Sequence, residues 1–251
     1  MKDNKTLAYI NLFAILGAIP MLCELSDEAQ KLIKNDKVSI GFAVKDGPSA
    51  TLIFDSGKAT MVEGVAQCNI KLPFSSPEKF NGMIDGVVTP FPSKGFTKIS
   101  FLLKKFSPLT DILSKYLRAT DEDMKDENFA RISTLLMFRV ITEAMSQIGN
   151  HDKIGSFTAS NIVDGSAKLS IGDDIEASIV CVDHKLHTVQ GKTDECTAYM
   201  AFSNLTDARA IFDGKLNALA AVGLGKVRVG GMISMIDNLN RILDRVSFYL
   251  A

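Results

Sequence analysis

The sequence of 251 residues contains no tryptophan, few cysteines and histidines, and no excess of charge of either sign. Its 28 Lys and Arg residues nearly balance its 29 Asp and Glu residues, which leaves a formal net charge of −1. No global field draws such a chain onto a polyanion, so we expect no nucleic-acid partner. The 15 phenylalanines and 10 methionines supply apolar groups without polar tips, which suit cores and apolar pockets.

Common signatures of catalysis are also missing. The sequence has no Gly-x-Ser-x-Gly motif and no evident pair of catalytic carboxylates, and Gly223-Leu-Gly-Lys226 is too short for a phosphate-binding loop. We therefore expect no enzymatic activity, no catalytic residue and no cofactor. Asp213 and Lys226 are interpreted as turn and strand-end residues rather than as an ion pair for a ligand head group.

Four potential zinc ligands, Cys181, His184, His187 and Cys196, lie close in the sequence. Their spacing is unsuitable, because residues 183–185 are typical of a hairpin turn whereas both cysteines belong to predicted strands. No metal site is expected.

The cysteines are interpreted as free, buried thiols. A chain of this length does not need disulfide staples, and Cys68 and Cys196 occupy equivalent places in the internal repeat described below. This interpretation, which also covers Cys23 and Cys181, favours a reducing, cytoplasmic location.

The main feature of the sequence is an internal repeat at an offset of 128 residues. The identities at this offset include Phe74 and Phe202, Ser75 and Ser203, Asp85 and Asp213, Gly86 and Gly214, and Lys98 and Lys226. The repeat predicts a first domain over residues 1–120, an acidic linker over 121–128 and a second domain over 129–251.

Alternation and turn residues predict the elements of each copy. In the first copy we expect strands over 38–44, 50–54, 66–74 and 98–102, and a short helix between the cap Ser76 and Gly86. In the second copy we expect a helix to about Ile148, a short helix between Asn204 and Gly214, and a final amphipathic stretch. The strands expected there are 155–161, 166–171, 176–182, 187–190, 195–202 and 225–229.

Residues 7–23 are strongly apolar and could be a secretory leader or anchor. The run is shorter than the roughly 20 residues of a membrane span, Asn11 and Pro20 interrupt it, and the second copy opens with a similar apolar helix at 129–145. We favour a buried first helix.

The block Phe212-Asp-Gly-Lys-Leu216, followed by Ala220-Ala-Val-Gly-Leu-Gly-Lys-Val-Arg-Val-Gly230 and an apolar, Met-rich helix, resembles the sterol carrier protein type two family. The resemblance covers most of residues 155–251. A weaker one covers 38–118, where Val87 stands in place of Lys215, Thr97 in place of Gly225, and no glycine matches Gly230.

This resemblance implies an α+β fold for two repeated domains, each a mostly antiparallel, about five-stranded sheet with helices packed on one face. It also implies an apolar tunnel that binds a lipid-like molecule, such as an acyl chain or sterol, without catalysis. Candidate lining residues in the second copy are Phe202, Phe212, Leu216, Leu219, Val222, Val227, Val229, Met232, Met235, Leu239 and Leu243.

Two alternatives remain. The copies could form a pseudo-symmetric scaffolding module with filled cores, or the chain could be an accessory subunit of an enzyme acting on lipids or thioesters. A transient membrane contact is a further hypothesis, because residues 94–118 carry six basic side chains and the single acid Asp111.

Overall fold

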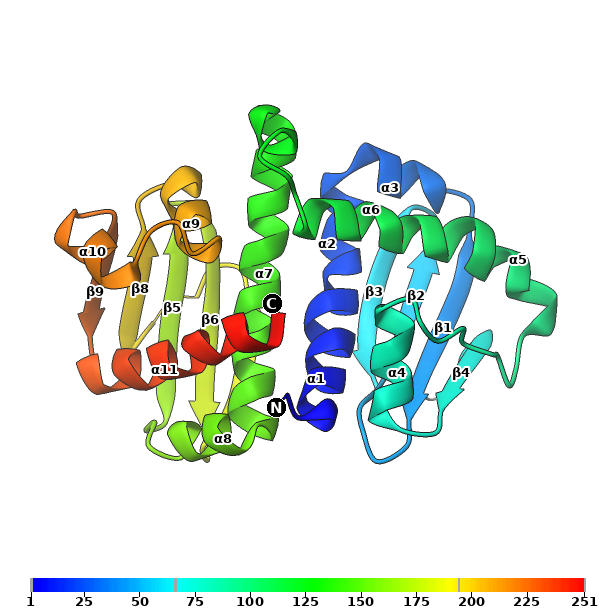
Figure 1. Cartoon of the computed structure of the whole chain (residues 1–251), viewed down its shortest axis with the longest axis horizontal. Helices are drawn as coiled ribbons and strands as arrows, with labels where there is room; N and C mark the ends of the chain where they lie inside the picture. The colour runs from blue at the N-terminus through cyan, green and yellow to red at the C-terminus, as the bar shows by residue number, and fades with distance from the viewer. Residues whose placement is uncertain (1, 66, 194, 251) are drawn as a thin grey trace. The chain divides into compact units, whose positions relative to one another are not determined.

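The chain divides into two compact units in the computed structural model, which describes residues 2–65, 67–193 and 195–250. Unit 1 comprises Met1–Leu136 and unit 2 comprises Met137–Ala251. The division falls inside helix α7 (Glu127–His151), drawn in green in Figure 1. The predicted linker 121–128 forms turns, a short 3-10 helix and the first residues of α7.

Unit 1 begins with a helical run and continues with a sheet and further helices. Its elements are α1 (Asn4–Tyr9), η1 (Ile10–Ile15), η2 (Leu16–Ala18), α2 (Ile19–Leu25), α3 (Asp27–Leu32), β1 (Lys37–Val44), β2 (Ser49–Asp55), β3 (Lys58–Glu63), β4 (Ile70–Phe74), α4 (Pro77–Ile84), η3 (Phe96–Lys98), α5 (Ile99–Phe101), η4 (Leu102–Phe106), α6 (Ser107–Leu117), η5 (Asp123–Lys125) and the start of α7.

Unit 2 begins within α7 and follows a similar order, with an additional strand, β9, before its last helix. Its elements are α8 (Lys153–Ala159), β5 (Gly165–Ile171), β6 (Ile175–Val182), β7 (Lys185–Gln190), β8 (Ala198–Phe202), α9 (Leu205–Phe212), α10 (Ala218–Gly223), β9 (Val227–Gly231) and α11 (Ile233–Leu250).

Each unit is built on a mixed sheet, which confirms the predicted α+β class. The described strands pair in the order β3-β2-β1-β4 in unit 1 and β7-β6-β5-β8-β9 in unit 2. In both sheets the pair β1 and β4, or β5 and β8, is parallel, and the other pairs are antiparallel. Figure 1 shows α4 and α6 lying over the first sheet, and α9 and α11 over the second.

The short helix after the fourth strand has the predicted caps in both units. The Ser76 hydroxyl accepts a hydrogen bond from the Lys79 amide, and Asn204 Oδ1 accepts one from the Asp207 amide. Gly86 and Gly214 then adopt positive φ angles of 72° and 69°, which end each helix.

Two predicted strands are wrong, because helical spacing prevails over local alternation. Residues 98–102 lie within consecutive helical segments from Phe96 to Leu117, and the buried side chains Phe101, Leu109 and Leu113 lie along one helix face. Residues 155–161 largely belong to α8, where Asp152 Oδ1 caps the amides of Ile154 and Gly155. The first sheet therefore lacks a counterpart of β9 among the described strands.

The segment Asn4–Leu25 is 22 residues of continuous helix with a mean hydropathy of 1.9 in its most apolar window, which is long and apolar enough to cross a membrane. The expectation that the apolar helix is too short to span a membrane is therefore wrong, because the helix extends beyond residues 7–23 at both ends. About 67% of that window is buried inside the protein. Burial of this kind agrees with a core helix, although a signal sequence has the same length and composition.

The expected burial of the cysteines holds for Cys23, Cys68 and Cys181, which are free thiols, but Cys196 is exposed. In unit 1, Cys68 Sγ lies 2.8 Å from the position that a β-carbon on Gly41 would take. Lys168 holds the equivalent position in unit 2, since Gly41 pairs with Lys71 and Lys168 with Tyr199. Because Lys168 has a side chain where Gly41 has none, the Cys196 thiol cannot pack over this strand position as the Cys68 thiol does.

A buried asparagine pair ties the first helical run of unit 1 to α4. Asn11 Nδ2 donates to Asn81 Oδ1 at 3.0 Å, and Asn81 Nδ2 donates to the Asn4 carbonyl at 3.0 Å. Asn11 and Asn81 are only 6% and 4% exposed, so each group depends on its protein partner rather than on water.

We predict that Asn81→Ala lowers the free energy of unfolding by about 1–3 kcal/mol, because it leaves the Asn11 amide buried without its acceptor. Urea denaturation measures the change. Asn35→Ala, at an exposed asparagine of the same unit, is the control and should change stability by less than about 0.5 kcal/mol. Equal effects of the two substitutions would contradict the structural role of the pair.

Candidate ligand-binding site

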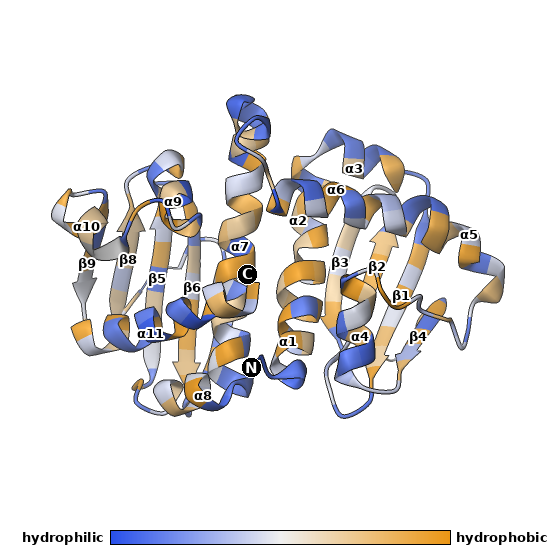
Figure 2. Cartoon of the chain, viewed as in Figure 1, coloured by the Kyte–Doolittle hydropathy of each residue, from blue (hydrophilic) through white to orange (hydrophobic). Residues whose placement is uncertain are grey.

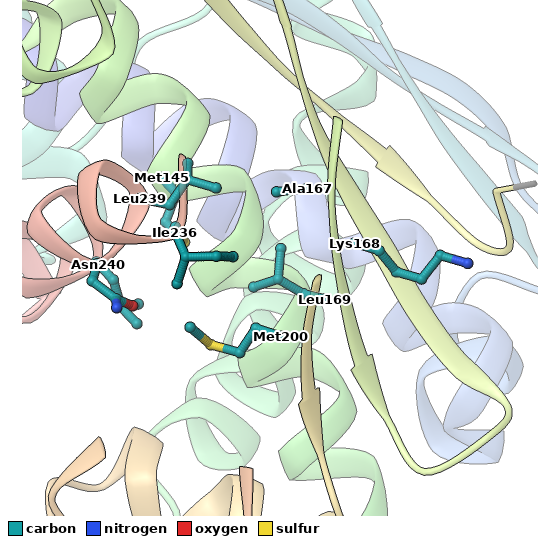
Figure 3. Close-up of a pocket in the computed structure, with 9 residues that line it drawn as sticks. Met145, Ala167, Lys168, Leu169, Met200, Ile236, Leu239 and Asn240 are labelled. Carbon is teal, nitrogen blue, oxygen red and sulfur yellow. The ribbon is translucent and has the colours of Figure 1, made fainter. Parts of the chain in front are cut away.

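An apolar hollow lies between α11 and the sheet of unit 2 (Figure 3). Helix α11 contributes Ile236, Leu239, Asn240 and Leu243, and α7 contributes Met145. The central parallel strands β5 and β8 contribute Ala167, Lys168, Leu169 and Met200.

Simple periodicity places these side chains. In β5, Ala167, Leu169 and Ile171 are buried while the residues between them are partly exposed, so one face of the strand looks toward the helices. In α11 the buried residues recur every three or four positions: Met235, Ile236, Leu239, Ile242, Val246 and Tyr249. Figure 2 shows α11 with alternating apolar and polar stretches. The apolar stripe of α11 and the apolar face of the sheet meet at the hollow.

The hollow is small. The empty space in and around it is about 260 Å³, which includes open solvent. The space that the centre of a water molecule can occupy is about 10 Å³, close to what one water needs. A larger guest therefore requires movement of the lining, and Met145 and Met200 have the flexible, unbranched side chains that permit it.

None of the lining residues points a charged group into the hollow. The Lys168 side chain points away from the other sticks in Figure 3, and its ammonium donates to the Thr193 carbonyl at 2.9 Å and lies 3.3 Å from Glu176 Oε1. The half-buried Asn240 is the one remaining polar lining residue. The interior is suited to hydrocarbon rather than to a charged group.

Strand register explains why unit 2 has this hollow. Phe42 pairs with Leu72 in unit 1, whereas Leu169 pairs with Met200 at the equivalent place in unit 2. Two residues earlier along these strands, unit 1 pairs Ile40 with Ile70, and unit 2 pairs Ala167 with Ala198. The Phe42 ring lies 6.3 Å from the Phe80 ring and 6.0 Å from the Phe106 ring, centroid to centroid. Unit 1 thus has a phenylalanine at the position where the equivalent strand of unit 2 has a smaller side chain.

Helix α11 is fixed at both ends. At its start, Gly231 has a φ of 78°, and a β-carbon there would lie 2.3 Å from the Thr197 carbonyl oxygen, so the chain passes closely over the beginning of β8. Near its end, Arg245 Nη2 and the Tyr249 hydroxyl donate to Asp152 Oδ2 at 2.7 and 2.8 Å. Arg245 Nε also lies 2.7 Å from Asp152 Oδ1.

Asp152 is almost wholly buried, with 4% of its surface exposed. Burial by itself raises the pKa of its carboxyl group, but the hydrogen bonds from Arg245, the Gly155 amide and Tyr249 outweigh burial and hold the pKa below its usual value. Asp152 therefore stays ionised and joins α8 to α11, the helix that roofs the hollow.

The predicted lining residues occupy several parts of unit 2. Leu239 and Leu243 line the hollow. Phe202, Val227 and Met235 are buried outside it, Phe212, Leu216 and Val229 are half-buried, and Val222 and Met232 are more than a third exposed. The side chain of Leu219 lies outside the described part of the structure.

Sequence reasoning missed Met145, Ala167, Leu169, Met200 and Ile236. The alternation of β5 and β8 and the apolar spacing of α7 and α11 mark all five as inward-facing. Nothing in that pattern distinguishes a side chain beside a hollow from one in a filled core.

The two residues interpreted as turn and strand-end groups have separate partners. Asp213 Oδ1 accepts from Arg209 Nε at 2.7 Å, while Lys226 Nζ donates to Asp207 Oδ1 at 2.8 Å. Within the described residues, no group of three or more His, Cys, Asp or Glu side chains is arranged to hold a metal ion.

No family model matches the chain, and no curated protein matches it. Among solved structures, the chain is similar to a UbiJ-SCP2 ubiquinone synthesis protein at 12% identity, with 43% of this chain and 88% of that chain covered and a TM-score of 0.34. It is also similar to sterol carrier protein 2 like 2 from Aedes aegypti at 16% identity, covering 41% and 94% with a TM-score of 0.30. A stereoselective inverting sec-alkylsulfatase from Pseudomonas sp. is similar at 11% identity, covering 57% and 28% with a TM-score of 0.25.

We predict that Arg245→Met lowers the free energy of unfolding by about 2 kcal/mol, because it removes a charged hydrogen bond and an ion pair to a buried carboxylate. Amide hydrogen exchange should speed up along α11. Arg241→Met, at an exposed position one turn earlier on α11, is the control and should leave both measurements nearly unchanged. Unchanged exchange in α11 of the Arg245 variant would contradict the anchoring role.

The lowered pKa of Asp152 predicts a pH dependence of stability. The contribution of the ion pair is fully present above the unfolded-state pKa of about 3.9 and is lost as the pH falls through the lower folded-state pKa. Asp152→Asn keeps a capping oxygen but removes the charge. The difference in unfolding free energy between wild type and this variant should be constant above about pH 5 and shrink below about pH 4. A difference independent of pH would contradict the assignment.

Proposed function

We propose that unit 2 binds an apolar, lipid-like molecule non-covalently in the hollow beneath α11. The observation that carries the proposal is an apolar opening between sheet and helix, at a level where the equivalent strands of unit 1 carry larger side chains. Interior sites for small molecules are commonly concave, mostly apolar and sparing in polar groups. The guest enters as Met145 and Met200 change rotamer, since the hollow at rest has room for about one water.

The finer proposal is that the chain is a tandem of two sterol-carrier-like domains and that acyl chains or sterols are the guests. The motif around residues 212–230 and the repeated element order support it. In this proposal unit 2 is the binding copy and unit 1 the filled one, because Phe42, Phe80 and Phe106 pack together in its core.

A scaffolding module with filled cores is the second candidate, and the small size of the hollow favours it. Under that alternative the lining residues only complete a core. The two candidates differ in whether unit 2 takes up a fluorescent fatty acid or sterol.

We predict that giving unit 2 the residues of unit 1, by Ala167→Ile with Leu169→Phe, reduces uptake of a fluorescent fatty acid at least tenfold by filling the hollow. Fluorescence titration measures uptake, and thermal unfolding monitored by circular dichroism reports folding. Tyr199→Lys makes the same kind of exchange, with Lys71 as its model, on the opposite face of β8, and should leave uptake unchanged.

Three outcomes can be distinguished. Loss of uptake in the double variant alone, with folding retained, supports the binding site. Wild-type protein that takes up neither fatty acid nor sterol favours the scaffolding module. Severe destabilisation of the double variant indicates overpacking of a core that is already full.

A further inference from the structure

Unit 1 has a segment that combines exposed aromatic side chains with several lysines. Between Asp85 and Asp111 the chain has four lysines and no acidic residue. Within it, Phe91, Phe96 and Leu103 are 74%, 53% and 66% exposed. The Phe91 and Phe96 rings lie 5.8 Å apart, centroid to centroid, so they form one apolar projection. We call residues 87–104 the aromatic–basic segment.

The backbone at residues 93–95 of this segment lies against the edge of the sheet. Lys71 of β4 donates its amide to the Lys94 carbonyl at 3.1 Å, and Ser93 donates its amide to the Lys71 carbonyl at 2.8 Å. Gly95 has a φ of 88°, and a β-carbon there would lie 2.4 Å from the Asn69 carbonyl oxygen. Phe91 and Phe96 thus flank a turn that is hydrogen-bonded to β4, and Figure 1 shows this part of the chain between α4 and α5.

The charge of this segment is available to a partner. Lys94 and Lys104 are exposed and Lys98 is half-buried, and within the described residues none of the three lies in an ion pair. Lys105 differs, because its ammonium donates to the Leu32 carbonyl at 2.8 Å. The whole chain has a net charge of −1, so the positive charge is local.

Unit 2 uses the same place in the repeat differently. There the segment after the short helix forms β9, which pairs along β8 from Val227 to Gly231. In unit 1 the corresponding contact with β4 is reduced to one bridge between Lys71 and Lys94. The exposed aromatic and basic side chains thus occur where unit 1 departs from the plan that it shares with unit 2.

We propose that the aromatic–basic segment docks unit 1 on an anionic phospholipid bilayer. The phenylalanines and Leu103 would enter the interface between head groups and acyl chains, while Lys94, Lys98 and Lys104 contact the lipid phosphates and carboxylates. An exposed apolar patch flanked by one sign of charge is expected to have a partner. A bilayer fits better than nucleic acid, because the aliphatic Leu103 gains by entering hydrocarbon but has no base-stacking face.

The test is sedimentation of the full-length chain with vesicles of phosphatidylcholine alone or phosphatidylcholine mixed with phosphatidylserine. We expect binding to the anionic vesicles, with loss at high salt as the screening length falls. Removing each lysine should weaken partitioning about fivefold, so Lys94→Gln with Lys98→Gln and Lys104→Gln should weaken it about 100-fold. Phe91→Ser with Phe96→Ser should weaken binding to the anionic vesicles at low salt, because it removes the apolar groups that enter the interface.

The matched control is Lys153→Gln with Phe157→Ser on α8 of unit 2, where Phe157 is 73% exposed beside a lysine. It should bind like wild type, and thermal unfolding should show that all variants fold. No sedimentation with anionic vesicles would overturn the proposal, as would binding that survives both segment variants, which would assign the contact to another region such as Asn4–Leu25. Equal loss in the control would also overturn it. Because none of these variants touches the hollow, uptake of fatty acid is a separate readout from docking.

Discussion

Burial of one apolar sheet face beneath helices is the constraint on which both units depend. A mixed sheet with one apolar face needs cover, and in unit 2 part of that cover comes from α11, whose own apolar stripe would otherwise be exposed. The position of α11 follows from a close backbone approach at Gly231 and from the buried carboxylate of Asp152 at the other end. Because Asp152 also caps α8, one ionised group couples two helices to each other and thereby sets the roof of the hollow.

The two units share the same pairing of their central strands but differ in the side chains that fill their cores. The pairing of the central parallel strands is the same in both, yet Phe42 and Ile40 in unit 1 correspond to Leu169 and Ala167 in unit 2. Protein interiors are close-packed, so a change of this size at adjacent levels is felt as space unless neighbouring side chains move in. The proposed binding site therefore rests on side-chain volume within a fixed backbone plan.

The units also differ where the chain leaves the short helix. In unit 2 a strand extends the sheet, and in unit 1 an ordered turn and a long helical run replace it. The replacement leaves β4 with one bridge at its edge and displays Phe91 and Phe96 to solvent. Edge strands invite pairing with other chains, and the turn over Lys71 covers part of this edge while it presents a new surface.

The sequence by itself determined the repeat, the α+β class, most strands and the caps of the short helices, because these depend on local alternation, glycine and capping residues such as Ser76 and Asn204. Two of the eleven candidate lining residues, Leu239 and Leu243, line the hollow. Only the tertiary structure decided that residues 98–102 and 155–161 are mainly helical, that Cys196 is exposed, and that Met145, Leu169 and Met200 meet at one hollow. Those outcomes depend on which side chains from distant segments compete for the same space, and periodicity along a single segment contains no information about that competition.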